Sequence, residues 1–313
     1  MELSPPDLPV VGGPVYGRRL AEVVRGAAIS LGANAYAEQD AARASASNRM
    51  WKIFGCGGFY LGPQAWTFNK FTAMEAIEFA GRAGATVIEF FPGQAFSKEK
   101  RDLKWDHNAT DDQHKEIADQ LAKWKIVPVN YGVTGLPNNE KEARKTFEFA
   151  KRLGLYAVTT ESTESVALLD KLAQEYNVRV AYHNHPKRDN DPKYKVWDPN
   201  YIVELTKDCS PLVGACADTG HWERSGLDPL AAVKTLKGRV ISSHFKDRVD
   251  IKSEDVPYGT GKTPLVAILE EFKAQGFKGN ISIEYETNWE HSLSDVAQCI
   301  GFVRAAGALK GWT

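Results

Sequence analysis

Short apolar, β-rich runs alternate with segments of helical periodicity from residue 59 to the end of the chain. Such alternation predicts parallel strands joined by helical crossovers. Eight strand–helix units within about 250 residues predict a closed (β/α)8 TIM barrel rather than an open sheet. An open, dinucleotide-binding sheet would also need a glycine-rich turn after its first strand, and residues 67–70 (Thr-Phe-Asn-Lys) do not form one. The expected strands are 60–67, 86–91, 127–133, 155–160, 178–183, 212–217, 239–245 and 280–285, and the expected helices are 72–83, 112–125, 140–153, 162–176, 199–207, 229–236, 264–275 and 294–306.

The net charge and hydropathy of the chain limit the classes of partner that it is expected to bind. The 313 residues carry a formal net charge of −1, which gives no general attraction for nucleic acid or for an anionic membrane. No apolar stretch approaches the roughly 18 residues that a membrane helix needs. We therefore expect a protein whose partner is a small molecule and which binds neither nucleic acid nor a membrane. A homo-oligomer is compatible with this composition.

The first residues differ from the rest and are rich in proline, glycine, alanine and serine. We predict an N-terminal extension over residues 1–58 and a barrel over residues 59–313. Two arginines precede a weakly apolar stretch at 26–33, and residues 35–37 have the small-x-small pattern of a signal-peptidase site. Charged residues interrupt the apolar region, so we favour a cytoplasmic protein, with export by a weak N-terminal signal as the alternative.

Four ionisable side chains each end a different predicted strand. They are Glu161, Asp218, His244 and Glu284. The carboxyl ends of barrel strands meet at one rim, so these residues are expected to lie close together. A single acidic residue at such a position is more often a helix cap or an ion-pair partner. Three carboxylates and an imidazole buried together need a cation, and oxygen ligands with one imidazole suit Mn²⁺, Mg²⁺ or Co²⁺. The set therefore predicts a site for one divalent metal ion.

Further polar and aromatic residues stand at the same predicted rim. His221 follows Asp218 by three residues, a spacing that brings both side chains near one point. His183 and His185 alternate along one strand and so face the same side. This pair is expected to bind substrate or transfer a proton, with a hydrogen-bonded structural pair as the alternative. Substrate contacts are also expected from Trp66, Lys246 and Trp222. For the two tryptophans the alternative is a place in the barrel core.

These motifs resemble those of the sugar phosphate isomerase/epimerase superfamily, whose barrels are xylose isomerase-like. The superfamily includes ketose 3-epimerases, inosose-processing enzymes and, more distantly, endonuclease IV. The resemblance extends over about residues 59–307. The stretches that carry it are Gly-Pro-Gln-Ala-Trp-Thr-Phe at 62–68, Ala-Tyr-His-Asn-His at 181–185, Ala-Asp-Thr-Gly-His-Trp at 217–222, Ser-His-Phe-Lys-Asp at 243–247 and Ile-Ser-Ile-Glu-Tyr-Glu at 281–286.

The resemblance implies roles for the four strand-end residues. In ketose 3-epimerases a Glu-Asp-His-Glu set holds Mn²⁺ or a similar ion, and the two glutamates exchange a proton beside the carbonyl. Carried over by motif, Glu161, Asp218, His244 and Glu284 would bind the metal, and the two glutamates would be catalytic. The ion would be Mn²⁺ first, with Mg²⁺, Co²⁺ and Zn²⁺ as alternatives. His221 would contact the substrate.

The chain differs from the ketose 3-epimerases and from endonuclease IV at several positions, and these differences limit which function we expect. Glu164 and Arg248 match only approximately a glutamate and an arginine of the epimerases. Endonuclease IV needs extra histidines where this chain has residues 89–91, 130–131 and 253–255, so its trinuclear zinc site cannot form and we do not expect DNA repair. We predict a metal-dependent sugar isomerase or epimerase. The first alternative is a 3-keto-glycoside lyase that works by β-elimination, for which His183, His185 or a glutamate is a candidate base. The second is a non-catalytic sugar-binding barrel.

Overall fold

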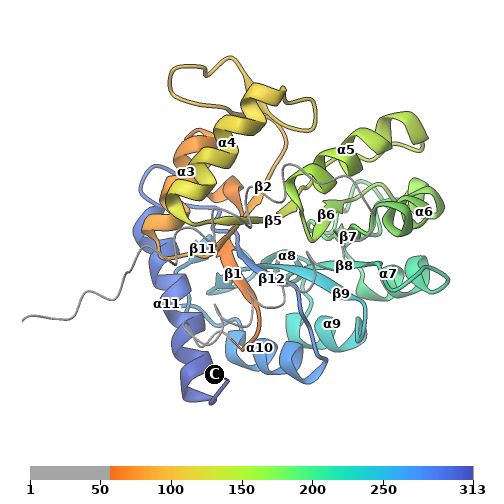
Figure 1. The fold of residues 1–313 in the computed structure, drawn as a ribbon. Coiled ribbons are helices and arrows are strands. Elements are labelled where there is room, and N and C mark those ends of the chain that lie inside the picture. The colour runs from red at the N-terminus through yellow and green to blue at the C-terminus, as the bar shows by residue number, and fades with distance from the viewer. Residues whose placement is uncertain (1–56, 313) are drawn as a thin grey trace, which may run out of the picture.

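Eight parallel strands form one sheet in the computed structural model, which describes residues 57–312. The strand order is β1-β12-β9-β8-β7-β6-β5-β2, and a parallel bridge between Gln64 and Glu89 joins the first strand to the last. Helices ring the strands, as Figure 1 shows. The predicted TIM barrel is therefore confirmed. The predicted extension over residues 1–58 lies almost wholly outside the described residues, and its boundary stays a prediction.

The element bounds agree with the expected ones to within a few residues, apart from one end of two segments and one helix that was not expected. The barrel strands are β1 (Tyr60–Pro63), β2 (Val87–Phe90), β5 (Val127–Tyr131), β6 (Ala157–Thr160), β7 (Arg179–His183), β8 (Val213–Asp218), β9 (Val240–Phe245) and β12 (Asn280–Ile283). The helices are α3 (Ala73–Arg82), α4 (Asp111–Trp124), α5 (Glu140–Leu153), α6 (Val166–Tyr176), α7 (Pro199–Thr206), α8 (Thr219–Arg224), α9 (Pro229–Thr235), α10 (Leu265–Ala274) and α11 (Leu293–Leu309). Two short antiparallel hairpins lie at the rim. One consists of β3 (Gln94–Ala95) and β4 (Lys104–Trp105), and the other consists of β10 (Asp247–Arg248) and β11 (Asp255–Val256).

Local hydrogen bonds explain where the expected bounds fail. The predicted first strand ends early because Gln64 caps a 3-10 helix, η1 (Ala65–Phe68), by accepting a hydrogen bond from the Trp66 backbone. The predicted helix at 162–176 starts as the 3-10 turn η2 (Thr163–Ser165). Helix α8 was not predicted, and Asp218 is its N-cap. Side-chain capping thus sets the starts of η1 and α8, whereas η2 begins without a side-chain cap.

Glycine at position 62 allows the barrel to close. A Cβ atom there would lie 1.9 Å from the carbonyl oxygen of Val87, a distance that no side chain tolerates. Glycine therefore lets β1 approach β2 closely enough for the bridge beside them. This closure brings the rim of β1 and β2 next to the rim of β12, which pairs with the other side of β1.

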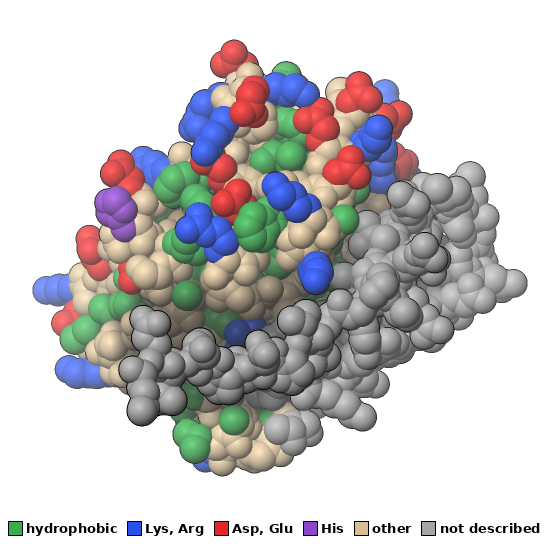
Figure 2. Space-filling view, turned by 60° about the vertical axis from the view of Figure 1, so that its left-hand side comes forward, with side chains coloured by type: hydrophobic (Ala, Val, Ile, Leu, Met, Phe, Trp, Pro, Cys, Tyr) green, Lys and Arg blue, Asp and Glu red, His purple; other side chains and the backbone are tan. Residues whose placement is uncertain are grey.

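The barrel strands are buried on both faces, as expected for a parallel sheet covered by helices. Apolar side chains fill the layer between strands and helices. The interior of the barrel instead holds buried polar groups, including Glu89, His244 and Ser282. Basic and acidic side chains are interspersed on the face shown in Figure 2. Within residues 57–312, every helix is too short or too polar to cross a bilayer.

Candidate active site

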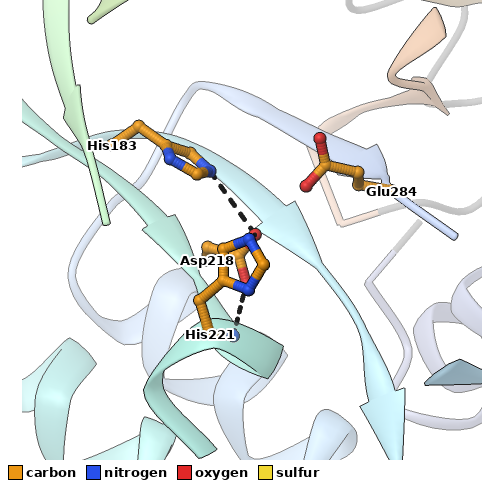
Figure 3. Close-up of side chains that lie close together, drawn as sticks. All are labelled: His183, Asp218, His221 and Glu284. Atoms are coloured by element: carbon orange, nitrogen blue, oxygen red, sulfur yellow. Dashed lines mark hydrogen bonds and ion pairs between the residues drawn. The ribbon is translucent and has the colours of Figure 1, made fainter. Parts of the chain in front are cut away.

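Four buried side chains meet at the C-terminal rim of the barrel. They are His183 at the end of β7, Asp218 at the end of β8, His221 in α8 and Glu284 just after β12. One potential ligand atom from each lies within 4.8 Å of the others. Figure 3 shows both imidazoles beside Asp218, with Glu284 across from them. The carboxylate of Asp218 accepts a 2.7 Å hydrogen bond from the His221 backbone, so the cap of α8 fixes their spacing.

The two imidazoles of this group fit a divalent cation. Both ring nitrogens of His183, and Nδ1 of His221, are buried without a hydrogen-bond partner among the described residues. Burial, reinforced by nearby positive charge, holds the pKa of each ring well below the usual value. Both rings are therefore neutral, the form that binds a metal. Two imidazoles and two carboxylates form a donor set typical of first-row transition metals.

Lys246 lies between the two carboxylates of the group. Its ammonium lies 2.5 Å from Asp218, contacts Glu284 as well, and lies 3.5 Å from Glu286. The side chain is fully buried. Burial opposes its charge, but Asp218 and Glu284 outweigh that effect and raise the pKa of Lys246 well above the usual value. The lysine predicted to contact substrate is thus held by carboxylates at the centre of the site.

His244 lies behind Glu284 and is bonded to a residue to which the sequence had assigned no role. Its Nδ1 is 3.2 Å from Glu284, and its Nε2 is 2.9 Å from Glu89, at the end of β2. Glu89 also accepts hydrogen bonds from Ser282 at 2.6 Å and from Asn280 at 3.1 Å. Asn280 and Ser282 alternate along the buried strand β12. Because buried polar groups need hydrogen-bond partners, this pattern in the sequence indicates a polar partner inside the barrel.

A second pair, Glu161 and His185, stands beside the buried group. Nδ1 of His185 lies 2.6 Å from Glu161, and the Tyr194 hydroxyl donates a 2.6 Å hydrogen bond to the same oxygen. Burial alone would raise the pKa of Glu161, but the bonds from His185 and Tyr194 lower it to about 2. Burial lowers the pKa of His185, yet Glu161 outweighs it and the net shift is upward. This carboxylate is therefore an anion that orients an imidazole.

The imidazole of His185 lies against the buried group. Its ring stacks on His221 at 5.0 Å and meets His183 edge-on at 4.6 Å between centroids. No hydrogen bond reaches Nε2 of His185 from the described part of the chain, and 41% of the side chain is exposed. Potential ligand atoms of Glu161, His183 and His185 also lie within 4.8 Å of one another. The two groups share His183 and together form one site.

The four residues predicted to bind the metal fall into two separate groups in the structure. Asp218 and Glu284 lie together in the buried group, whereas Glu161 belongs to the neighbouring pair. His244 reaches the group only through Glu284 among the predicted ligands. His183 and His221, for which the sequence predicted substrate contact, are the residues that lie beside Asp218 and Glu284. The ligand roles of Glu161 and His244 stay predictions.

The two tryptophans expected to contact substrate lie in different surroundings. Trp66 stands at the rim and is 40% exposed. Trp222 is buried in the hydrophobic core, and its indole N–H has no hydrogen-bond partner within residues 57–312. Only Trp66 therefore offers a surface to a ligand in this conformation. Tyr194 and Arg188, which contact Glu161, come from the loop after β7 and were not predicted.

Fold and site together define a TIM barrel with a buried histidine–carboxylate cluster at its C-terminal rim. A family model described as xylose isomerase-like TIM barrel matches residues 77–305, and the chain belongs to this family. The resemblance inferred from the motifs is thereby confirmed.

Several characterised and solved proteins are similar to this chain. An inosose dehydratase from Clostridium tetani is 33% identical over 79 residues, 25% of each chain, and one from Lactiplantibacillus plantarum is 28% identical over 140 residues, 37% of this chain and 43% of that one. The chain thus spans less than half the length of the curated relatives it matches. The crystal structure of an uncharacterized protein from Parabacteroides distasonis is similar at 31% identity and a TM-score of 0.64, over 79% of this chain and 99% of that one. A D-allulose 3-epimerase from Methylomonas sp. shares the fold at 14% identity and a TM-score of 0.61, over 79% of this chain and 98% of that one.

Proposed function

We propose that the chain is a metal-dependent isomerase or epimerase that removes a proton from the carbon beside the carbonyl of a keto-sugar. The observation that carries this proposal is the Glu161–His185 pair, which lies against the buried histidine–carboxylate group. A base next to a cation site is the arrangement that proton abstraction beside a carbonyl requires. The names of similar proteins, 3-epimerase and inosose dehydratase, support a sugar substrate.

The buried group would hold one divalent cation through His183, Asp218, His221 and Glu284. When bound, the ion supplies a Lewis acid that polarises the sugar carbonyl. A donor set with two imidazoles favours Mn²⁺, Co²⁺ or Zn²⁺ over Mg²⁺, which prefers oxygen ligands. We retain Mn²⁺ as the first candidate.

Within the second pair, we assign proton transfer to His185 and orientation to Glu161. The sequence favoured Glu161 itself, but a carboxylate with a pKa of about 2 is a weak base. The raised pKa of His185 makes its imidazole the stronger base of the two. Tyr194 fixes this pair, because its hydroxyl bonds both the Glu161 carboxylate and the His185 backbone.

The second candidate function is a lyase or dehydratase that works by β-elimination. The two glutamates expected to exchange a proton are unequal, because Glu161 is 23% exposed whereas Glu284 is 7% exposed and paired with Lys246. One accessible base suffices for elimination, in which the leaving group rather than a second base completes the reaction. The stretches similar to inosose dehydratases also favour this candidate.

Solvent deuterium separates the two candidates. With Mn²⁺ and a panel of ketoses and 3-keto-glycosides in D₂O, we expect one deuterium beside the carbonyl because the proton on that carbon leaves during the reaction. An intact labelled sugar supports isomerisation or epimerisation, whereas release of water or of an aglycone supports elimination. Mass spectrometry and NMR provide the measurement. Absence of both outcomes across the panel would count against both functions.

Metal removal tests the cation site. We expect a chelator to abolish exchange and Mn²⁺ to restore it, and the purified protein to hold about one ion per chain. Alanine at His183 is expected to weaken metal binding at least about tenfold, because a buried ligand is lost. The exposed His291 serves as a matched control for replacement of a histidine by alanine. Metal content and titration calorimetry give the readout, and equal binding by H183A and H291A would contradict the site.

A further inference from the structure

An open pocket of about 550 Å³ lies at the rim of the barrel. It is formed by the loops that follow β1, β2 and β12, three strands adjacent in the barrel. Its walls combine aromatic and basic side chains. These are Trp66, Phe91 and Trp289 together with Lys70, Arg101 and Lys104.

The aromatic side chains form a connected wall. The ring of Trp66 meets Phe91 edge-on at 5.1 Å and Trp289 edge-on at 6.3 Å between centroids. Such packing holds the indole in place while leaving it 40% exposed. An indole fixed in this way offers a flat apolar surface on which a sugar or aryl ring can stack. The wall therefore fits a ring-shaped ligand.

The basic side chains leave the pocket with unbalanced positive charge. Lys70, Arg101 and Lys104 line it, and none of them makes an ion pair with a carboxylate in the described residues. No aspartate or glutamate lines the pocket. By contrast, Lys100 on the same hairpin pairs with Glu116 at 2.7 Å. Three cations around an aromatic wall match a ligand with a negative charge.

Chain connections join this pocket to the β12–β1–β2 side of the barrel rim, across the barrel from β6 and β7, which precede Glu161 and His185. Trp66 follows Gln64 by two residues, and its backbone N–H bonds the Gln64 side chain at 2.5 Å. Gln64 is bridged to Glu89, which lies inside the barrel mouth. Trp289 lies five residues after Glu284. The pocket is therefore connected through the chain to the part of the rim that carries Glu284 of the buried group.

We infer that the pocket is a subsite for a second, acidic ring joined to the reacting keto-sugar. The substrate class is then an acidic glycoside, with a carboxylated or phosphorylated ring as its other part, rather than a free monosaccharide. This inference rests on the proposed function for the identity of the reacting end. The pocket itself recognises the acidic ring by stacking and by charge.

Binding of aryl glucosides tests the subsite without any turnover. We compare phenyl β-D-glucopyranoside with its 4-carboxyphenyl and 4-phosphonooxyphenyl analogues, using tryptophan fluorescence and calorimetry on the full chain. The acidic probes are expected to bind about tenfold tighter at low salt, and this advantage is expected to shrink as salt screens the charges. The stronger of the two acidic probes identifies the anion, and preference for either one over the phenyl compound supports the subsite.

Paired variants assign the selectivity to the pocket. R101Q combined with K104Q is expected to weaken binding of the acidic probes about fivefold or more, because exposed charge pairs each contribute modestly. The phenyl compound is expected to bind this variant and the native chain alike. K100Q removes a neighbouring charge from the same hairpin and is the matched control. Equal affinity of acidic and phenyl probes, or an equal loss in K100Q, would overturn the inference.

Deuterium exchange on small ketoses, measured in parallel on the native chain, keeps the two proposals separable. If the chain binds the acidic probes more tightly but exchanges deuterium into no substrate, the subsite is supported and the proposed function is contradicted. If deuterium exchange occurs but the acidic probes bind no more tightly than the phenyl compound, the proposed function is supported and the subsite is contradicted.

Discussion

Replacement of His185 by alanine is expected to lower the rate of proton exchange by about 10²–10⁴-fold, the contribution typical of a positioned general base. The imidazole is the accessible base of the site, and its Nε2 has no hydrogen bond within residues 57–312. Its ring is partly exposed, so the fold is expected to survive its loss. Metal content is expected to stay near that of the native chain if the cation is held by the buried group. Exchange kinetics and metal analysis on the same sample measure both.

A double-mutant cycle shows whether Glu161 acts through His185. E161Q keeps the shape of the side chain but removes the charge that orients the imidazole, so we expect a large loss of rate. The combined E161Q/H185A variant is expected to be no slower than H185A alone, because residues that act as one unit are not additive. Y194F, which removes a single hydrogen bond to Glu161, serves as the milder comparison. Losses that multiply in the double variant, or native rates in H185A, would contradict the assignment.

Much of this architecture could be predicted from the sequence, because it is local. Alternating periodicities fixed the number and order of the strands, and the ends of parallel strands share one rim. Asp218 and His221 were expected together because His221 stands three positions after Asp218, and the N-cap of α8, which was not predicted, holds them together. The end of α5 is local in the same way, because Gly154 adopts a left-handed φ of 65° there without strain.

The pairing of side chains across the barrel could not be predicted in the same way. Glu89 and His244 are 155 residues apart in sequence, and only the closed barrel brings them within hydrogen-bond distance. Lys246 was expected at the rim, but its contact with two buried carboxylates depends on how far its long side chain reaches inward. Tyr194 lies in a loop whose path the periodicity does not describe. The rim was thus predictable, whereas the partition of its residues into two groups was not.

Replacement of Lys246 by methionine is expected to destabilise the metal-free protein by about 3–5 kcal/mol, the cost typical of breaking a buried ion pair from one side. The change leaves Asp218 and Glu284 buried, close together and without their ammonium partner. Methionine has nearly the same length, so lost packing contributes little. Chemical denaturation in the presence of a chelator measures the free energy of unfolding.

Divalent metal is expected to restore more stability to K246M than to the native chain. In the native chain the ammonium competes with the ion for the same two carboxylates, whereas in the variant that competitor is absent. Preferential binding of the ion to the folded state then raises the free energy of unfolding by an amount that grows with the logarithm of the affinity. K100M, which breaks the exposed pair with Glu116, is the matched control and is expected to change stability by less than about 1 kcal/mol, with no metal dependence. If K246M unfolds like the native chain without metal, or gains no more than K100M when metal is added, then Lys246 does not balance the charge of this site.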